Sequence, residues 1–202
     1  MNEGVILLQK LTFKDIHEEQ IIDTRLQKAF QAGSIKDAIN IPLAKFEKTS
    51  LSLLDPLIPT VFILSENDND HLNSLATTGQ ALGFDSIKGY LLAEELPVEH
   101  LHRTETLSAK DFLETKKDYI LLDVRDQATV TKLAPEKNLV TISIADLAKD
   151  YLNLDETKEI FTLCGSGNSA TAAASFLNKQ GRKSTVIEGG MTAIQKELEA
   201  KK

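Results

Sequence analysis

The sequence predicts an α/β protein made of two similar domains, each with a mainly parallel sheet flanked by helices. Three observations lead to this prediction. The 202-residue chain contains an internal repeat whose period is close to 100 residues. Within each copy, short apolar stretches alternate with helical stretches, which is typical of parallel sheets covered on both faces. Each copy also has the size of a small independent domain.

Each copy opens with a helix-start signal, followed by an apolar strand that ends in Asp-x-Arg. The first copy reads LTFKDIHEEQIIDTR and the second reads LSAKDFLETKKDYILLDVR. Thr12 and Ser108 are placed as N-caps, each with an aspartate three residues later. The strands end at Asp23 and Asp123, which lie 100 positions apart (123 − 23).

A second pair of matching segments places a strand before a turn and a helix. VFILSENDND aligns with IFTLCGSGNS, so that Ser65 and Cys164 lie 99 positions apart (164 − 65). The helices HLNSLATTGQALGF and ATAAASFLNKQGR follow, and Gly83 and Gly181 are expected to cap their C-termini. A short strand then closes each copy, in DSIKGYL and in KSTVIEGG.

The expected boundary between the domains lies in the segment 95–108. This segment is polar, contains Pro97 and lacks helical periodicity. We therefore expect one domain over residues 1–100 and a second over residues 101–202.

Composition excludes several classes of function. A net charge of −7 with scattered basic residues argues against a nucleic-acid partner. No apolar run approaches the ~20 residues of a membrane helix, and the N-terminus lacks the basic lead and cleavage site of a signal peptide. The single cysteine excludes an internal disulfide and a cysteine-based zinc site, and the four histidines show no metal-ligand spacing. We expect a cytoplasmic protein without metal or cofactor.

Cys164 stands where the strand IFTL meets a glycine-rich turn and a helix. Gly165 and Gly167 can adopt positive φ, so successive backbone N–H groups can converge on one point at the positive end of the helix dipole. Each N–H bond to an anion contributes about 1.5–3 kcal/mol, more than the ~0.3–1 kcal/mol of the dipole. The turn therefore favours a reactive thiolate, although a small buried apolar cysteine is the alternative interpretation. The expected binding loop consists of Gly165, Ser166, Gly167, Asn168 and Ser169.

These motifs resemble a rhodanese domain. In the second copy the resemblance depends on three features: Asp-x-Arg at a strand end, Cys-x-x-Gly-Asn-Ser before an alanine-rich helix, and Glu-Gly-Gly-Met over residues 188–191. In the first copy, GSIKDAINIP is similar to another family segment, and GFDSIKGYL is similar to the tandem rhodanese tail of persulfide-dioxygenase-like metallo-β-lactamase proteins. The resemblance implies sulfur transfer through a persulfide on Cys164, from thiosulfate or a persulfide donor to a thiol or cyanide acceptor.

Both copies depart from the family pattern. In the first, Ser65 replaces the cysteine, and Glu66, Asp68 and Asp70 make the turn acidic. A hydroxyl cannot hold sulfane sulfur and the carboxylates would repel an anion, so we expect this domain to be inactive. The second copy has no arginine in its loop and Ile194 where tryptophan is frequent in the family. Thiosulfate is therefore expected to be a weak donor, and a protein or small-molecule persulfide the natural one.

Asp123 and Arg125 are expected mainly to tie neighbouring loops together, since Asp23 and Arg25 repeat the pair in the inactive copy. Arg125 could instead face the site and hold an anion.

Two other functions compete with sulfur transfer. A phosphatase or arsenate reductase of the related type needs an arginine after the cysteine, and the sequence has none from Gly165 to Leu177. A non-enzymatic persulfide carrier or interaction module needs the same activated thiol as the enzyme, so the sequence does not separate these two.

Overall fold

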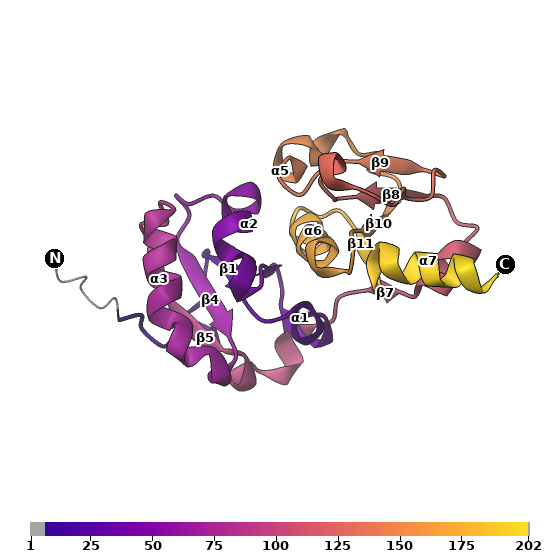
Figure 1. Ribbon diagram of the computed structural model, residues 1–202. Helices are drawn as coiled ribbons and strands as arrows, with labels where there is room; N and C mark the ends of the chain where they lie inside the picture. The colour runs from indigo at the N-terminus through magenta and orange to yellow at the C-terminus, as the bar shows by residue number, and fades with distance from the viewer. Residues whose placement is uncertain (1–6, 202) are drawn as a thin grey trace. The chain divides into compact units, whose positions relative to one another are not determined.

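The computed structural model describes residues 7–201 and divides the chain into two compact units, Met1–Arg103 and Thr104–Lys202 (Figure 1). The division follows Arg103 because Leu101 and His102 pair with Ser34 and Ile35 of the first unit. The boundary expected after residue 100 thus lies three residues before the observed division (103 − 100), because these two paired residues belong to the first unit. The first six residues, where the sequence argues against a leader, lie outside the described part.

The first unit contains a four-stranded sheet in the order β3-β1-β4-β5, and all its strand pairs are parallel. A separate antiparallel ribbon joins β2 to β6. The strands are β1 (Gln20–Asp23), β2 (Ser34–Ile35), β3 (Ile39–Asn40), β4 (Thr60–Leu64), β5 (Ile87–Leu92) and β6 (Leu101–His102). The α/β fold with a mainly parallel sheet is confirmed for this unit.

Both faces of this sheet are covered, as a parallel sheet requires. The helices are α1 (Gln27–Ala32), α2 (Phe46–Leu53) and α3 (Leu72–Ala81). On one face Val61 and Ile63 pack with Phe30 of α1. On the other, Phe62 meets Phe46 of α2 edge-on, with ring centroids 5.4 Å apart. Alternate residues of β4 therefore serve two apolar layers.

Short 3₁₀ turns connect these elements, and one of them differs from the sequence expectation. They are η1 (Phe13–Asp15), η2 (Leu43–Lys45), η3 (Glu66–His71), η4 (Ala93–Glu95) and η5 (Val98–His100). After Thr12 the chain forms the single turn η1 and not the expected helix, although the Thr12 hydroxyl does donate to Asp15 at 2.7 Å. The acidic turn after Ser65 is a 3₁₀ helix that runs into α3.

The second unit contains a five-stranded sheet in the order β7-β11-β10-β8-β9, again parallel throughout. Its strands are β7 (Thr106–Leu107), β8 (Tyr119–Asp123), β9 (Leu139–Thr141), β10 (Glu159–Leu163) and β11 (Ser184–Ile187). Its helices and 3₁₀ turns are α4 (Ala109–Glu114), η6 (Gln127–Thr129), α5 (Leu147–Asp150), η7 (Tyr151–Asn153), α6 (Asn168–Lys179) and α7 (Gly190–Ala200). The expected N-cap at Ser108 accepts the Asp111 N–H at 3.0 Å.

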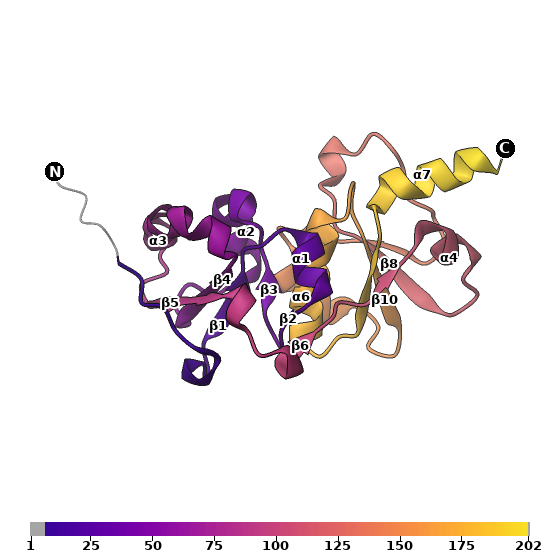
Figure 2. The same cartoon turned by 90° about the horizontal axis from the view of Figure 1, so that it is seen from below.

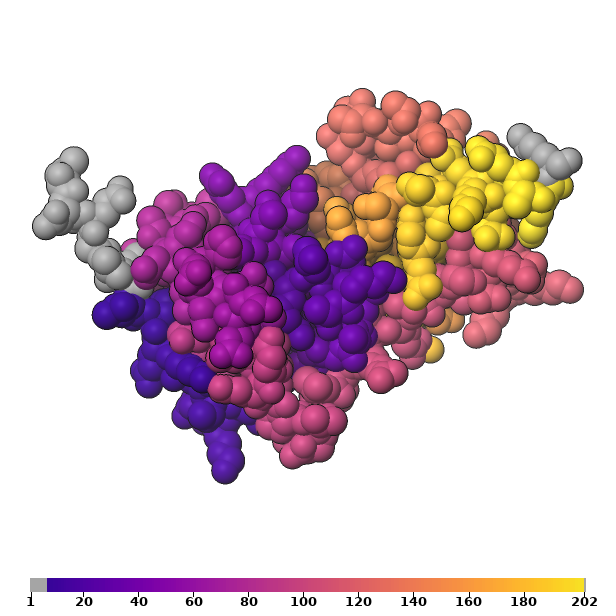
Figure 3. All heavy atoms as spheres, turned by 60° about the horizontal axis from the view of Figure 1, so that its bottom comes forward, coloured from indigo at the N-terminus to yellow at the C-terminus, as the bar shows by residue number. Residues whose placement is uncertain are grey.

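Helices α6 and α7 lie on opposite faces of this second sheet (Figure 2). Phe161 and Leu163 of β10 share an apolar cluster with Met191 and Ile194 of α7. Thr162, between them, points to the other face and donates to the Ala170 carbonyl of α6 at 3.1 Å. The outer side of α7 is exposed on the face seen in Figure 3. Cys164, directly after β10, therefore lies where both helices begin.

The described residues contain no helix long and apolar enough to cross a membrane. Over the same residues, no group of three or more His, Cys, Asp or Glu side chains is placed to hold a metal ion.

Candidate active site

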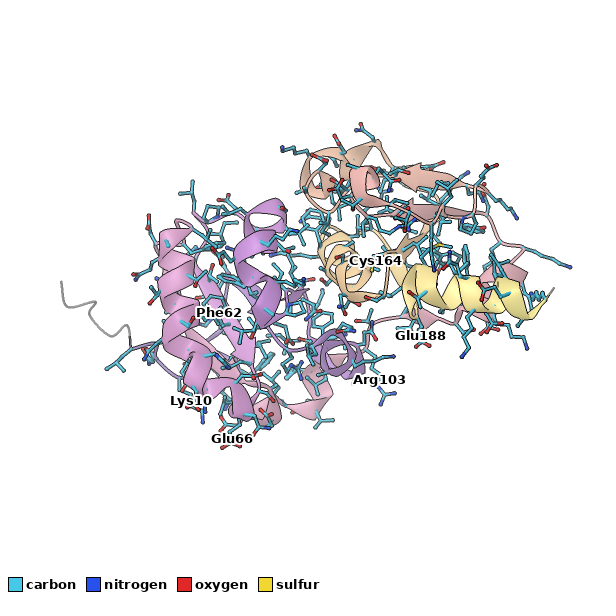
Figure 4. All side chains as sticks on the ribbon, viewed as in Figure 1. Lys10, Phe62, Glu66, Arg103, Cys164 and Glu188 are labelled. Atoms are coloured by element: carbon cyan, nitrogen blue, oxygen red, sulfur yellow. The ribbon has the colours of Figure 1, made fainter. Side chains whose placement is uncertain are left out.

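Cys164 is buried at the end of β10, with 4% of its surface exposed (Figure 4). Its Sγ accepts a hydrogen bond from the Gly167 N–H at 3.0 Å. Gly167 has φ of 100°, in the left-handed region, and α6 begins at the next residue. The glycine lets the chain reverse over the sulfur and enter the helix in one step. Its N–H and the start of α6 both lie at the sulfur, where such groups stabilise a bound anion.

The Gly-Gly-Met segment holds the thiol loop in place, because the start of α7 binds the loop's carbonyl groups. The Met191 N–H donates to the Cys164 carbonyl at 2.8 Å. The Thr192 N–H and hydroxyl both donate to the Gly165 carbonyl at 3.1 Å. Gly190 has φ of 55°, and a Cβ there would lie 2.3 Å from the Cys164 carbonyl oxygen. The close approach of α7 to the loop therefore requires glycine at this position.

The predicted loop residues are consecutive around the sulfur, but of the five N–H groups expected to donate to it, one does so. Among the five predicted N–H donors, that of Gly167 bonds Sγ, and the Gly167 carbonyl turns to the Thr171 N–H at 3.0 Å. The expectation of positive φ at Gly165 is wrong: the positive-φ glycines include Gly167 but not Gly165. Gly165 adopts another backbone conformation, in which its carbonyl accepts hydrogen bonds from Thr192 of α7. Apart from its two chain neighbours, no described residue has an atom within 4 Å of a Cβ placed on Gly165, so the loop surface is open on that side.

The side chain of Asn168 is a feature that the sequence does not reveal. Its Oδ1 is buried and has no hydrogen-bond partner among the described residues, and the same holds for Oδ1 of Asn69. Asn69 follows Ser65 by four positions (69 − 65), as Asn168 follows Cys164 (168 − 164). A buried, unsatisfied amide oxygen thus recurs at the matching position of the two copies.

Asp123 and Arg125 form a bidentate ion pair beside the site. Nε and Nη2 of Arg125 donate to the two Asp123 oxygens at 2.8 and 2.6 Å, and Nη1 donates to the Lys132 carbonyl at 2.8 Å. This guanidinium therefore closes the segment from Arg125 to Lys132, and its charge is balanced by Asp123.

The first unit builds the same ion pair from Asp23 and Arg25. The Arg25 Nη2 donates to Asp23 at 2.6 Å and to the Gly33 carbonyl at 2.8 Å. The repeated geometry agrees with a loop-tying role for the pair in both units.

The turn after β4 holds a carboxylate that sequence reasoning missed. The Ser65 hydroxyl donates to Oε1 of Glu94 at 2.6 Å, and the Glu66 N–H donates to Oε2 of the same residue at 3.1 Å. The hydrogen bond from Ser65 is the main cause that lowers the pKa of Glu94 below its ordinary value. Glu94 is distant in sequence, and nothing in its neighbourhood AEEL marks it as a partner of Ser65.

Comparisons with known proteins agree with the motifs. A family model described as "Rhodanese-like domain" matches residues 7–91 and 108–197. A curated protein of Bacillus subtilis (strain 168), named "Putative sulfurtransferase YtwF", is 31% identical over 97 residues, which are 48% of this chain and 92% of that protein.

Solved structures match about half of the chain. A rhodanese-related protein from Thermoplasma volcanium is 28% identical, with 46% of this chain and 92% of that chain covered and a TM-score of 0.40. An NAD-dependent persulfide reductase from A. fulgidus is 26% identical, with 44% of this chain and 15% of that chain covered and a TM-score of 0.38. The family resemblance stated for both copies rests on the family model and is confirmed.

Proposed function

Because this chain belongs to the rhodanese-like domain family, we propose that it is a sulfurtransferase whose second unit carries sulfane sulfur on Cys164. The observation that carries the proposal is the hydrogen bond from the Gly167 N–H to the Cys164 Sγ. A fixed N–H at this distance stabilises a thiolate before the reaction and the inner sulfur of a persulfide during it.

The reaction has two displacements and no net oxidation. The Cys164 thiolate attacks the sulfane sulfur of the donor, an S–S bond forms at Sγ, and the donor's own bond to that sulfur breaks. Thiosulfate then leaves as sulfite, and a persulfide leaves as its thiolate. In the second step an acceptor thiolate or cyanide attacks the outer sulfur, the Cys164 S–S bond breaks, and the thiolate is restored.

The shape of the site supports a slender donor. Cys164 is 4% exposed, so a reagent must bring a narrow sulfur end to it. The loop is open on the side of Gly165, where a Cβ would meet no atom within 4 Å outside the two neighbouring residues of the chain. A terminal sulfane sulfur is a single atom and fits such an approach, whereas a branched electrophilic centre does not.

Charge at the site favours a persulfide donor over thiosulfate. The loop from Gly165 to Ser169 has no lysine or arginine. The Arg125 guanidinium is bound to Asp123 and to the Lys132 carbonyl. A thiosulfate dianion would therefore find little positive charge, while a persulfide brings a single charge on the sulfur that the loop binds. We infer a small-molecule or protein persulfide as donor and a thiol as acceptor, in the reducing cytoplasm where a free thiol stays available.

Steady-state kinetics with two donors test this function. We expect a higher kcat/KM for glutathione persulfide with a thiol acceptor than for thiosulfate with cyanide. Cys164→Ser should abolish both activities, and Ser65→Ala, its matched change in the first unit, should leave both unchanged. Turnover in Cys164→Ser would refute the assignment, and loading of one sulfur without turnover would make the chain a persulfide carrier.

A further inference from the structure

The first unit contains a counterpart of the thiol site, and the strand registers align the two. Leu64 of β4 pairs with Leu92 of β5. In the second unit Thr162 of β10 pairs with Val186 of β11, which places Leu163 level with Ile187. Ser65 and Cys164 each follow the strand end by one residue. Leu92 and Ile187 are therefore matching positions at the ends of β5 and β11. Two residues after them stand Glu94 in the first unit (92 + 2) and Gly189 in the second (187 + 2).

At this position the first unit carries a carboxylate and the second carries no side chain. Both oxygens of Glu94 are bound, one by the Ser65 hydroxyl at 2.6 Å and one by the Glu66 N–H at 3.1 Å. Gly189 has φ of 67°, and a Cβ there would lie 2.8 Å from Cβ of Ala193. The first unit therefore places a side chain against its turn at this position, and the second unit has no side chain there.

We propose that the turn after β4 is a carboxylate-binding site which Glu94 occupies from within the same unit, and that this internal ligand closes the first unit to thiol and anion chemistry. The proposal goes beyond sulfur transfer at Cys164, because it concerns the unit without a cysteine. The loss of the cysteine alone would leave the Ser65 hydroxyl and the Glu66 N–H without this acceptor, whereas Glu94 binds both. An internal ligand is present at a high effective concentration, so an external anion competes poorly.

The charge state of Glu94 agrees with this role. The Ser65 hydrogen bond lowers the pKa of the carboxyl group, and the Glu66 N–H and the charge of Arg25 act in the same direction. The next residue, Glu95, makes a different contact: it pairs with Lys10 at 2.6 Å. The two neighbouring glutamates can therefore be compared directly.

A single introduced thiol reports on the site. In the double variant Ser65→Cys, Cys164→Ser, the thiol at position 65 lies against the Glu94 carboxylate, which disfavours its thiolate. Adding Glu94→Ala should speed alkylation by iodoacetamide at pH 7 by about 10-fold, the effect of about one pKa unit. Adding Glu94→Gln, which keeps the shape and removes the charge, should act in the same direction.

Two matched controls separate the bound carboxylate from general surface charge. Two further variants add either Glu95→Ala or Glu66→Gln to the same double variant. Each should change the alkylation rate by less than about 2-fold, because exposed charges interact only weakly. An unchanged rate with Glu94→Ala and Glu94→Gln would overturn the proposal. Equal acceleration by Glu66→Gln would also overturn it, because the acidic turn and not the internal ligand would then control the thiol.

Discussion

Gly190 is the position where one added methyl group should most disturb the thiol site. Its φ of 55° costs an L-residue about 1–2 kcal/mol. A Cβ would also lie 2.3 Å from the Cys164 carbonyl oxygen, so α7 and the loop must separate. Losing the Met191 N–H bond to that oxygen costs about 0.5–1.5 kcal/mol more. Gly190→Ala should therefore lower the free energy of unfolding by about 1.5–3.5 kcal/mol.

Gly181 supplies the matched control for this change. It has φ of 75°, and a Cβ there would meet nothing within 4 Å. Gly181→Ala should lose only the backbone contribution of about 1–2 kcal/mol and keep the reactivity of Cys164. Urea unfolding followed by circular dichroism gives the free energies, and the rate of alkylation by iodoacetamide gives the reactivity. Equal stability losses in the two variants, or normal alkylation in Gly190→Ala, would refute the clamp between α7 and the loop.

Three further results are expected. Ser65→Cys in a Cys164→Ser background should take up no sulfur from a persulfide donor, and measurable uptake would contradict the closed first site. Gly167→Val should slow alkylation of Cys164 by about 10-fold, because a branched residue resists φ of 100° and the N–H leaves the sulfur; an unchanged rate would mean that the turn does not activate the thiol. Since the pKa of Glu94 is lowered by folding, its contribution to stability is present above the ordinary glutamate range and is lost as the pH falls through the folded-state value. The difference in free energy of unfolding between the wild type and Glu94→Gln should therefore shrink in acid. A difference that grows in acid would mean that folding raises the pKa of Glu94, contrary to this account.

The fold can be predicted because its signals are local and occur twice. The pattern places helix C-caps at Gly83 and Gly181, and both have positive φ, 92° and 75°. Each apolar run before a turn forms a buried parallel strand, since such runs have no polar face to expose. The short helices α1 and α2 have too few residues for a clear period, and the β2–β6 ribbon joins distant segments, so the sequence reveals neither.

The candidate site can be predicted only in part. Cys164 and Gly167 are three residues apart, and their contact follows from the turn itself. The contact of Gly190 with Cys164 and the contact of Glu94 with Ser65 depend on strand register. The register brings together residues that are 26 positions apart in the first pair (190 − 164) and 29 positions apart in the second (94 − 65). A single sequence does not specify this register to the residue. Glycine at position 165 allows positive φ, but the donors of α7 fix it in another conformation.

The mass of the intact protein after exposure to a persulfide donor tests the central claim most directly. We predict a gain of one sulfur atom per chain, located on the peptide that contains Cys164 and removed by cyanide or a thiol. Ser65→Ala should gain the same sulfur, and Cys164→Ser should gain none. A protein that gains no sulfur, or one that gains it equally in Cys164→Ser, would contradict sulfur transfer through this thiol.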